Sequence, residues 1–137
     1  MKMQIKGILF DFDGTIANTI DLIIATFEHT CREVLGFTPE REKIVATFGL
    51  PLPEAMIALS GKPELVETMR DAYREYNNAH HDDMIRPIPG VKETLEQLKA
   101  QGIKLAVVTS KKPPMLRRGL DCLQPVSYTH LDAADEL

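Results

Sequence analysis

The order of apolar and polar positions predicts two buried strands separated by a long helical stretch. Residues 5–12 form a short apolar run with β-branched and aromatic side chains, and Gly14 follows it, as expected for a strand that leads into a turn. Residues 103–109 form a second run of the same kind. Both runs end in polar residues, which a buried strand would not do without a reason.

Four helices are predicted between these strands. The first carries an apolar stripe at three- and four-residue steps, and Gly36 closes it. The stripe consists of Ile20, Ile23, Ile24, Phe27, Cys31, Val34 and Leu35. Thr38 is expected to be the N-cap of a second helix that runs to about Phe48, with Pro39 at its first position. A short third helix and a longer fourth helix follow. Four consecutive helices are more than the one helix of a simple βαβ crossover.

The chain after the insert returns to an alternating order of helix and strand. Residues 86–90 are proline-rich, and proline disfavours helix just before it, so an irregular connection is expected there. Val91, Leu95 and Leu98 then follow at helical spacing. A last helix is predicted over residues 113–123, started by two prolines.

These elements predict an α/β fold, namely a partial doubly wound, Rossmann-like core with an inserted α-helical cap. The core comprises residues 1–17 and 86–124, and the cap comprises residues 18–85. Residues 125–137 show no clean period and are expected to be an atypical tail.

Composition and charge narrow the possible partners. The net charge of −4 comes from 20 acidic and 16 basic residues, and the basic ones are scattered, which argues against nucleic acid or an anionic membrane. Cys31 and Cys122 form no CxxC pair, so neither a disulfide framework nor a zinc site is predicted. The N-terminal apolar run is too short for a signal-peptide core, and no later run approaches the ~18 apolar residues of a membrane span. A cytoplasmic protein is expected, and the sequence leaves its oligomeric state open.

The polar residues that follow the two predicted strands suit phosphoryl transfer. Ligands bind outside the carboxyl ends of strands in open α/β sheets, and Asp11, Asp13 and residues 109–111 occupy those positions. Alternation places both carboxylates on one side, where they repel unless a divalent cation lies between them or one keeps a proton. One carboxylate can attack phosphorus while the other protonates the leaving oxygen. Gly14 allows a turn at positive φ that directs backbone N–H groups toward an oxyanion.

Two motifs carry a resemblance to a known family. DFDGT at residues 11–15 resembles the first signature of the haloacid dehalogenase (HAD) superfamily, and VVTSK at residues 107–111 resembles its second. Within that superfamily, the helical insert is similar to the small cap of phosphoglycolate phosphatases and related inorganic pyrophosphatases. The resemblance implies a Mg²⁺-dependent phosphatase that forms an aspartyl-phosphate intermediate. Its substrate would be a small phosphate monoester, such as phosphoglycolate, or pyrophosphate.

The same resemblance implies roles for individual residues. Asp11 would be the nucleophile and a magnesium ligand, and Asp13 the general acid/base that also lends its main-chain carbonyl to the metal. The implied phosphate-binding residues are Gly14, Thr15, Thr109, Ser110 and Lys111. Asn18, Thr19 and the loop at Gly49 would contact the substrate, whereas Asn18 and Thr19 fit plain helix-capping equally well.

The end of the chain lacks features that the superfamily needs. A third-motif lysine and a later acidic pair are required, yet no Lys or Arg follows Arg118. Asp132 and Asp135 have no apolar strand before them and are not assigned to the acidic pair. The ending SYTHLDAADEL also resembles translated sequencing-adapter DNA. We therefore expect the natural reading frame to be lost near Gln124 or Pro125, and the chain as it stands to be inactive.

Other interpretations stay open. The chain could be a non-catalytic fragment that binds phosphate or a protein partner, or part of a phosphomutase that transfers phosphate to a sugar in place of water. Residues 80–83 gather two histidines and two aspartates, but adjacent helical side chains point about 100° apart, so a polar helix end is expected there and not a metal site. His29 and His130 have no partners at ligand spacing and are expected to be structural or solvated.

Overall fold

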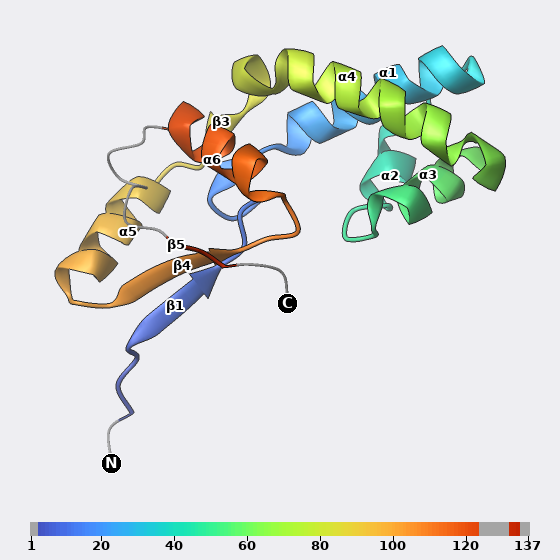
Figure 1. Cartoon of the computed structure of the whole chain (residues 1–137). Helices are drawn as coiled ribbons and strands as arrows, with labels where there is room; N and C mark the ends of the chain where they lie inside the picture. Colours follow the sequence, from blue (N-terminus) through green and yellow to red (C-terminus); the bar gives the residue numbers. More distant parts are fainter. Residues whose placement is uncertain (1–2, 124–131, 135–137) are drawn as a thin grey trace. The chain divides into compact units, whose positions relative to one another are not determined.

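The computed structural model describes residues 3–123 and 132–134 (Figure 1). The chain divides into two compact units. One is formed by the described residues of Met1–Thr19 and Ile85–Leu137, and contains the sheet; the other is the helical segment Ile20–Met84. The α/β fold class predicted from the sequence is confirmed.

A small parallel sheet organises the first unit. Its strands are β1 (Gly7–Phe10), β4 (Lys104–Val108) and β5 (Asp132–Ala134), in the order β1-β4-β5. The register between β1 and β4 runs from Gly7 opposite Lys104 to Phe10 opposite Val107. The two strands therefore end at the same edge of the sheet, which brings the residues after Phe10 and after Val108 together.

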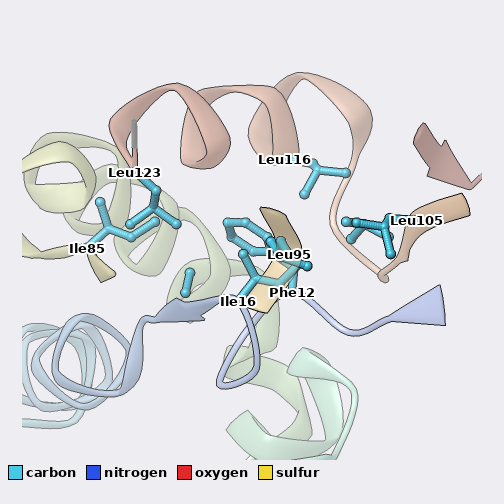
Figure 2. Packing of buried hydrophobic residues seen from close by; sticks show 9 residues of the cluster. Phe12, Ile16, Ile85, Leu95, Leu105, Leu116 and Leu123 are labelled. Atoms are coloured by element: carbon cyan, nitrogen blue, oxygen red, sulfur yellow. The ribbon is translucent and has the colours of Figure 1, made fainter. Parts of the chain in front are cut away.

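Helices α5 (Val91–Ala100) and α6 (Pro113–Cys122) supply side chains to the apolar core of this unit. Leu105 and Val107 are buried on one face of β4, because alternate residues of a strand point the same way. Phe12, Ile16 and Leu95 lie close together in this core (Figure 2). The buried members of the cluster are Phe12, Ile16, Ala17, Ile85, Leu95, Leu105, Val107, Leu116 and Leu123.

The first strand is shorter and less buried than the sequence predicted. It begins at Gly7 rather than at Ile5, and the side chains of Ile5 and Leu9 are each 68% exposed. Ile8 and Phe10 pack against the core cluster, whereas Leu9 points to the opposite face. The run of apolar residues suggested burial on both faces, but in the described residues only one face of β1 packs against the cluster.

Three short strands were not predicted. The pair β2 (Ala17–Asn18) and β3 (Arg86–Pro87) is antiparallel, and β3 lies within the segment for which an irregular connection was expected. The strand β5 pairs in parallel with β4 within the predicted tail. Strands of two or three residues are made by backbone hydrogen bonds alone, so they leave no alternating pattern in the sequence.

The second unit is entirely helical. It contains α1 (Ile20–Leu35), α2 (Arg41–Val45), α3 (Leu52–Ser60), the 3₁₀-helix η1 (Pro63–Leu65) and α4 (Val66–Met84). Its core is a separate cluster that consists of Ile24, Phe27, Cys31, Ile44, Ala55, Met56 and Met69. Burial raises the pKa of the Cys31 thiol to about 11, so this side chain is a protonated packing residue. No helix of the described residues is long and apolar enough to cross a membrane.

The ends of α1 and α2 test two capping predictions. Gly36 closes α1 as expected, with φ of 79° and its N–H directed at the carbonyls of Cys31 and Arg32. The second prediction is wrong, because α2 begins at Arg41 and Thr38 does not cap it. The Thr38 hydroxyl instead accepts a hydrogen bond from the Arg32 side chain at 3.3 Å.

The histidines of this unit are less solvated than the sequence suggested. His81 is fully buried, and its Nδ1 lies 2.8 Å from the carboxylate of Asp82. His29 stacks on Tyr76 with ring centroids 4.5 Å apart, and Tyr76 contacts His80 at 4.2 Å. The His29–Tyr76 stack joins α1 to α4, and the polar composition of these positions gave no indication of such packing.

Replacement of Phe27 tests the core of the helical unit. Phe27 is 4% exposed and meets the edge of the Tyr73 ring at a centroid distance of 5.0 Å. Because a cavity would replace the ring, Phe27→Ala should lower the free energy of unfolding by about 3–5 kcal/mol. The matched control is Phe48→Ala, since Phe48 is 38% exposed; its loss should be about 1 kcal/mol. Urea unfolding monitored by circular dichroism at 222 nm measures both, and equal losses would contradict the assigned core.

Candidate active site

The candidate site lies at the carboxyl ends of β1 and β4. Asp11 follows β1 directly, and Thr109, Ser110 and Lys111 follow β4. Because β1 and β4 are hydrogen-bonded neighbours in parallel, both segments emerge at the same edge. This is the location at which open α/β sheets bind ligands.

The turn after Asp11 is organised around one carbonyl group. The Phe12 carbonyl accepts hydrogen bonds from the N–H groups of Thr15, Ile16 and Ala17 at 3.2, 3.0 and 3.0 Å. Gly14 has φ of 79°, a backbone conformation that favours glycine. Its N–H donates to the Ala17 carbonyl at 2.7 Å, so it is engaged within the turn. The predicted role of Gly14 toward an anion stays a prediction.

The two carboxylates have different surroundings. Asp11 is exposed, and its Oδ1 accepts the Phe12 N–H at 2.8 Å. The Asp13 side chain is 31% exposed, and its Oδ1 accepts a hydrogen bond from the Thr19 hydroxyl at 3.0 Å. The Lys111 ammonium group lies 3.3 Å from the same oxygen. Asp13 is therefore fixed by two donors from its own unit, whereas Asp11 keeps an open side.

Lys111 joins the two strand ends. The sequence assigned its charge to a phosphate group, and the structure adds an ion pair with Asp13. Its Nζ also lies 6.0 Å from the centre of the Phe12 ring, at the outer limit of a cation–π contact. The backbone N–H of Lys111 donates to the Thr109 hydroxyl oxygen at 3.1 Å, which orders the segment after β4.

The other predicted site residues are distributed as follows. Thr15 is exposed in the turn, and Ser110 is exposed after β4. Thr19 is 1% exposed and contacts Asp13, a partner that sequence reasoning missed. The six-residue spacing gave no helical or strand period that would have indicated this contact. Asn18 belongs to β2 opposite Arg86, and Gly49 lies in the helical unit with φ of 91°; their contact with a substrate stays a prediction.

The oxygen atoms of this site fit a magnesium ion. Mg²⁺ prefers oxygen ligands in octahedral geometry and keeps several waters, so it is usually bound by one or two carboxylates together with substrate oxygens. Asp11 offers a carboxylate on its open side. The Asp13 carboxylate is already paired with Lys111, so the Asp13 main-chain carbonyl stays the expected second ligand. Water and substrate oxygens would complete the coordination.

The fold and these motifs together define a family. The chain belongs to the haloacid dehalogenase-like hydrolases, whose family model matches residues 8–130. The predicted resemblance is therefore confirmed.

More specific similarity is to pyrophosphatases. The "Putative pyrophosphatase PpaX" of Clostridium perfringens is 44% identical over 125 residues, which cover 91% of this chain and 58% of that protein. The pyrophosphatase PpaX of Halalkalibacterium halodurans is 42% identical over 118 residues, which cover 86% of this chain and 54% of that protein. The chain thus spans little more than half the length of these relatives.

A solved structure shows the same fold. The crystal structure of a predicted phosphoglycolate phosphatase from Haemophilus somnus has a TM-score of 0.82 and covers 98% of this chain and 65% of that one. The two sequences are 23% identical, so this similarity concerns the fold alone.

A magnesium titration tests the proposed metal ligands. Mg²⁺ should shift the amide resonances of Phe12 and Gly14, because both lie in the turn that carries Asp11. Asp11→Asn replaces a charged ligand oxygen by a neutral amide oxygen and should weaken binding by at least ~10-fold, since even the loss of a group that only orients a metal ligand costs that much. Asp21→Asn is the control, since Asp21 is an exposed aspartate in the first turn of α1. An equal effect of both substitutions on the NMR titration would remove Asp11 from the metal site.

Proposed function

We propose that this chain is part of a Mg²⁺-dependent phosphatase that uses Asp11 as its nucleophile. The observation that carries the proposal is that the ends of β1 and β4 meet. Asp11 is open to solvent after β1, and Lys111, which follows β4, pairs with Asp13. A carboxylate oxygen of Asp11 attacks phosphorus, and the bond from phosphorus to the leaving oxygen breaks. The product of this step is an aspartyl-phosphate on Asp11. When bound, magnesium supplies positive charge that offsets the negative charge of the phosphoryl group.

Asp13 is proposed as the general acid and base. In the first step it gives a proton to the leaving oxygen, and in the second it takes a proton from the water that attacks phosphorus and releases Asp11. The contacts with Thr19 and Lys111 hold the Asp13 side chain in place for both steps.

The residues after β4 and the turn after β1 are proposed to bind phosphate. Thr109 and Ser110 offer hydroxyl groups, Lys111 offers charge, and Thr15 offers an exposed hydroxyl on the neighbouring turn. Gly14 keeps this turn open at positive φ. The proposed substrate contacts from Asn18, Thr19 and Gly49 rest on the family resemblance; for Thr19, contact with Asp13 makes support of the acid/base the better role.

Pyrophosphate is the substrate class with the strongest support. Relatives at 42–44% identity carry the name pyrophosphatase. A small phosphate monoester such as phosphoglycolate is the second member of the class, since one phosphoryl group is transferred in either case. A cytoplasmic location belongs to the same proposal.

The nucleophile can be tested once a turnover-competent protein is made. The 137-residue chain itself is proposed to be inactive, because it spans little more than half the length of its pyrophosphatase relatives. Joining residues 1–124 to the C-terminal core of a pyrophosphatase relative should give Mg²⁺-dependent release of phosphate from pyrophosphate. Asp11→Asn in this fusion should abolish turnover, and beryllium fluoride should be trapped on Asp11. Asp21→Asn serves as control. Retained turnover in Asp11→Asn would refute the proposed nucleophile.

The acid/base role makes a separate prediction in the same fusion. Asp13→Asn should slow hydrolysis of substrates with poor leaving groups by ~10²–10⁴-fold. The loss should be smaller for p-nitrophenyl phosphate, whose leaving group needs little protonation. Steady-state rates with phosphoglycolate and p-nitrophenyl phosphate measure the difference. Equal losses for both would assign Asp13 to metal binding or to structure.

A further inference from the structure

Gly119 lies against the Phe12 ring of the catalytic turn, so closely that an added Cβ atom would force a neighbour to move. It lies in the interior of α6 and is buried. A Cβ atom at this position would lie 2.7 Å from Cζ and 3.0 Å from Cε2 of the Phe12 ring. The same Cβ would lie 3.6 Å from Cδ1 of Ile85. The first two separations are shorter than carbon–carbon contact, so an alanine would require the ring to move.

The other glycines of the described residues do not share this property. Gly7 would place a Cβ 3.4 Å from the Lys104 carbonyl oxygen, an ordinary contact. The remaining glycines have positive φ and open space around them, so they serve the backbone of turns. Gly119 has no positive φ, and glycine in the interior of a helix is less favourable than alanine. Its presence in α6 is explained by the close approach of Phe12.

Phe12 is the residue between the two catalytic aspartates. Its N–H donates to Asp11 Oδ1, and its carbonyl accepts the three N–H groups that close the turn beyond Asp13. Displacement of its backbone would therefore move both carboxylates. Phe12 thus connects the apolar core, through its side chain, to the turn with the two aspartates, through its backbone.

The ring has little freedom to avoid an added methyl group. It is 0% exposed, and the buried side chains around it include Ile16 and Leu95 (Figure 2). Rotation of a phenyl ring about its own axis leaves Cζ in place, so it cannot relieve a contact with that atom. Movement of the whole side chain would require the backbone of Phe12 to follow, because interiors are close-packed.

We propose that Gly119 is a positioning residue for catalysis. Because Gly119 has no side chain, the Phe12 ring packs directly against α6. This packing fixes the turn that holds Asp11 and Asp13. The catalytic part of this inference rests on the proposed phosphatase function. The geometric part does not, and it can be measured in the 137-residue chain alone.

The geometric part is tested by amide hydrogen exchange in four variants: Gly119→Ala, Gly7→Ala, Phe12→Leu and the double variant Gly119→Ala/Phe12→Leu. Gly119→Ala should speed exchange of the Ile16 and Ala17 amides, which donate to the Phe12 carbonyl, on the order of 10-fold relative to the amides of β4. Gly7→Ala is the matched control, since it adds the same methyl group to the same unit without a clash. The double variant Gly119→Ala/Phe12→Leu removes Cζ and Cε2, the two clashing atoms, and should return the exchange rates to those of Phe12→Leu.

The catalytic part is tested in the fusion of residues 1–124 with a relative's C-terminal core. Gly119→Ala should lower kcat for pyrophosphate by ~10²-fold with little change in KM, because a displacement of about 1 Å of reacting groups has that effect. The double variant should recover most of kcat relative to Phe12→Leu, while Gly7→Ala should match the parent. A general loss of helix stability would lower the melting temperature without rescue by Phe12→Leu.

Each outcome has a distinct meaning. If Gly119→Ala leaves both the Ile16 and Ala17 exchange and kcat unchanged, the positioning role is wrong. If exchange rises without rescue in the double variant, the effect comes from α6 as a whole, and the inference is again overturned. If Asp11→Asn retains turnover while the exchange pattern holds, the proposed nucleophile fails and the Phe12–Gly119 contact stands.

Discussion

Parallel pairing of β1 with β4 is the constraint on which the candidate site depends. The two strands are separated in the sequence by more than ninety residues, yet their register places Phe10 beside Val107. A slip of one residue would reverse the face to which every side chain of β4 points. Leu105 and Val107 would then leave the core, so burial of these two residues fixes the register. The same register brings Lys111 within reach of Asp13.

The electrostatic arrangement follows from this pairing. Two acidic side chains separated by one residue repel each other, and the structure places a cation and a buried hydroxyl at Asp13 alone. Asp11 is left on the open side with one backbone contact. This asymmetry distinguishes a carboxylate that is held in place from one that is available to react, and it arises from residues of the sheet-containing unit.

Much of the fold could be predicted from the sequence because it rests on apolar periodicity. The stripe along α1 and the Gly36 terminus needed only local spacing. The strands β2, β3 and β5 could not be predicted, since two or three residues paired by backbone carry no pattern. Asp11 and Asp13 were predicted from their motif, whereas the contacts of the Thr19 hydroxyl with Asp13 and of Gly119 with Phe12 exist only in the folded chain. Thr38 resembled a cap by type and spacing, but the Arg32 side chain uses its hydroxyl instead.

The open face of β1 has a consequence for handling the protein. Within the described residues β1 is the outer strand of the sheet, and Ile5 and Leu9 present apolar side chains to water beside its unpaired backbone edge. An outer strand of this kind, without a proline and with apolar side chains on its free face, is a template for strand addition between molecules. Preparations at high concentration will favour such association, and a lysine in place of Leu9 would oppose it without entering the core.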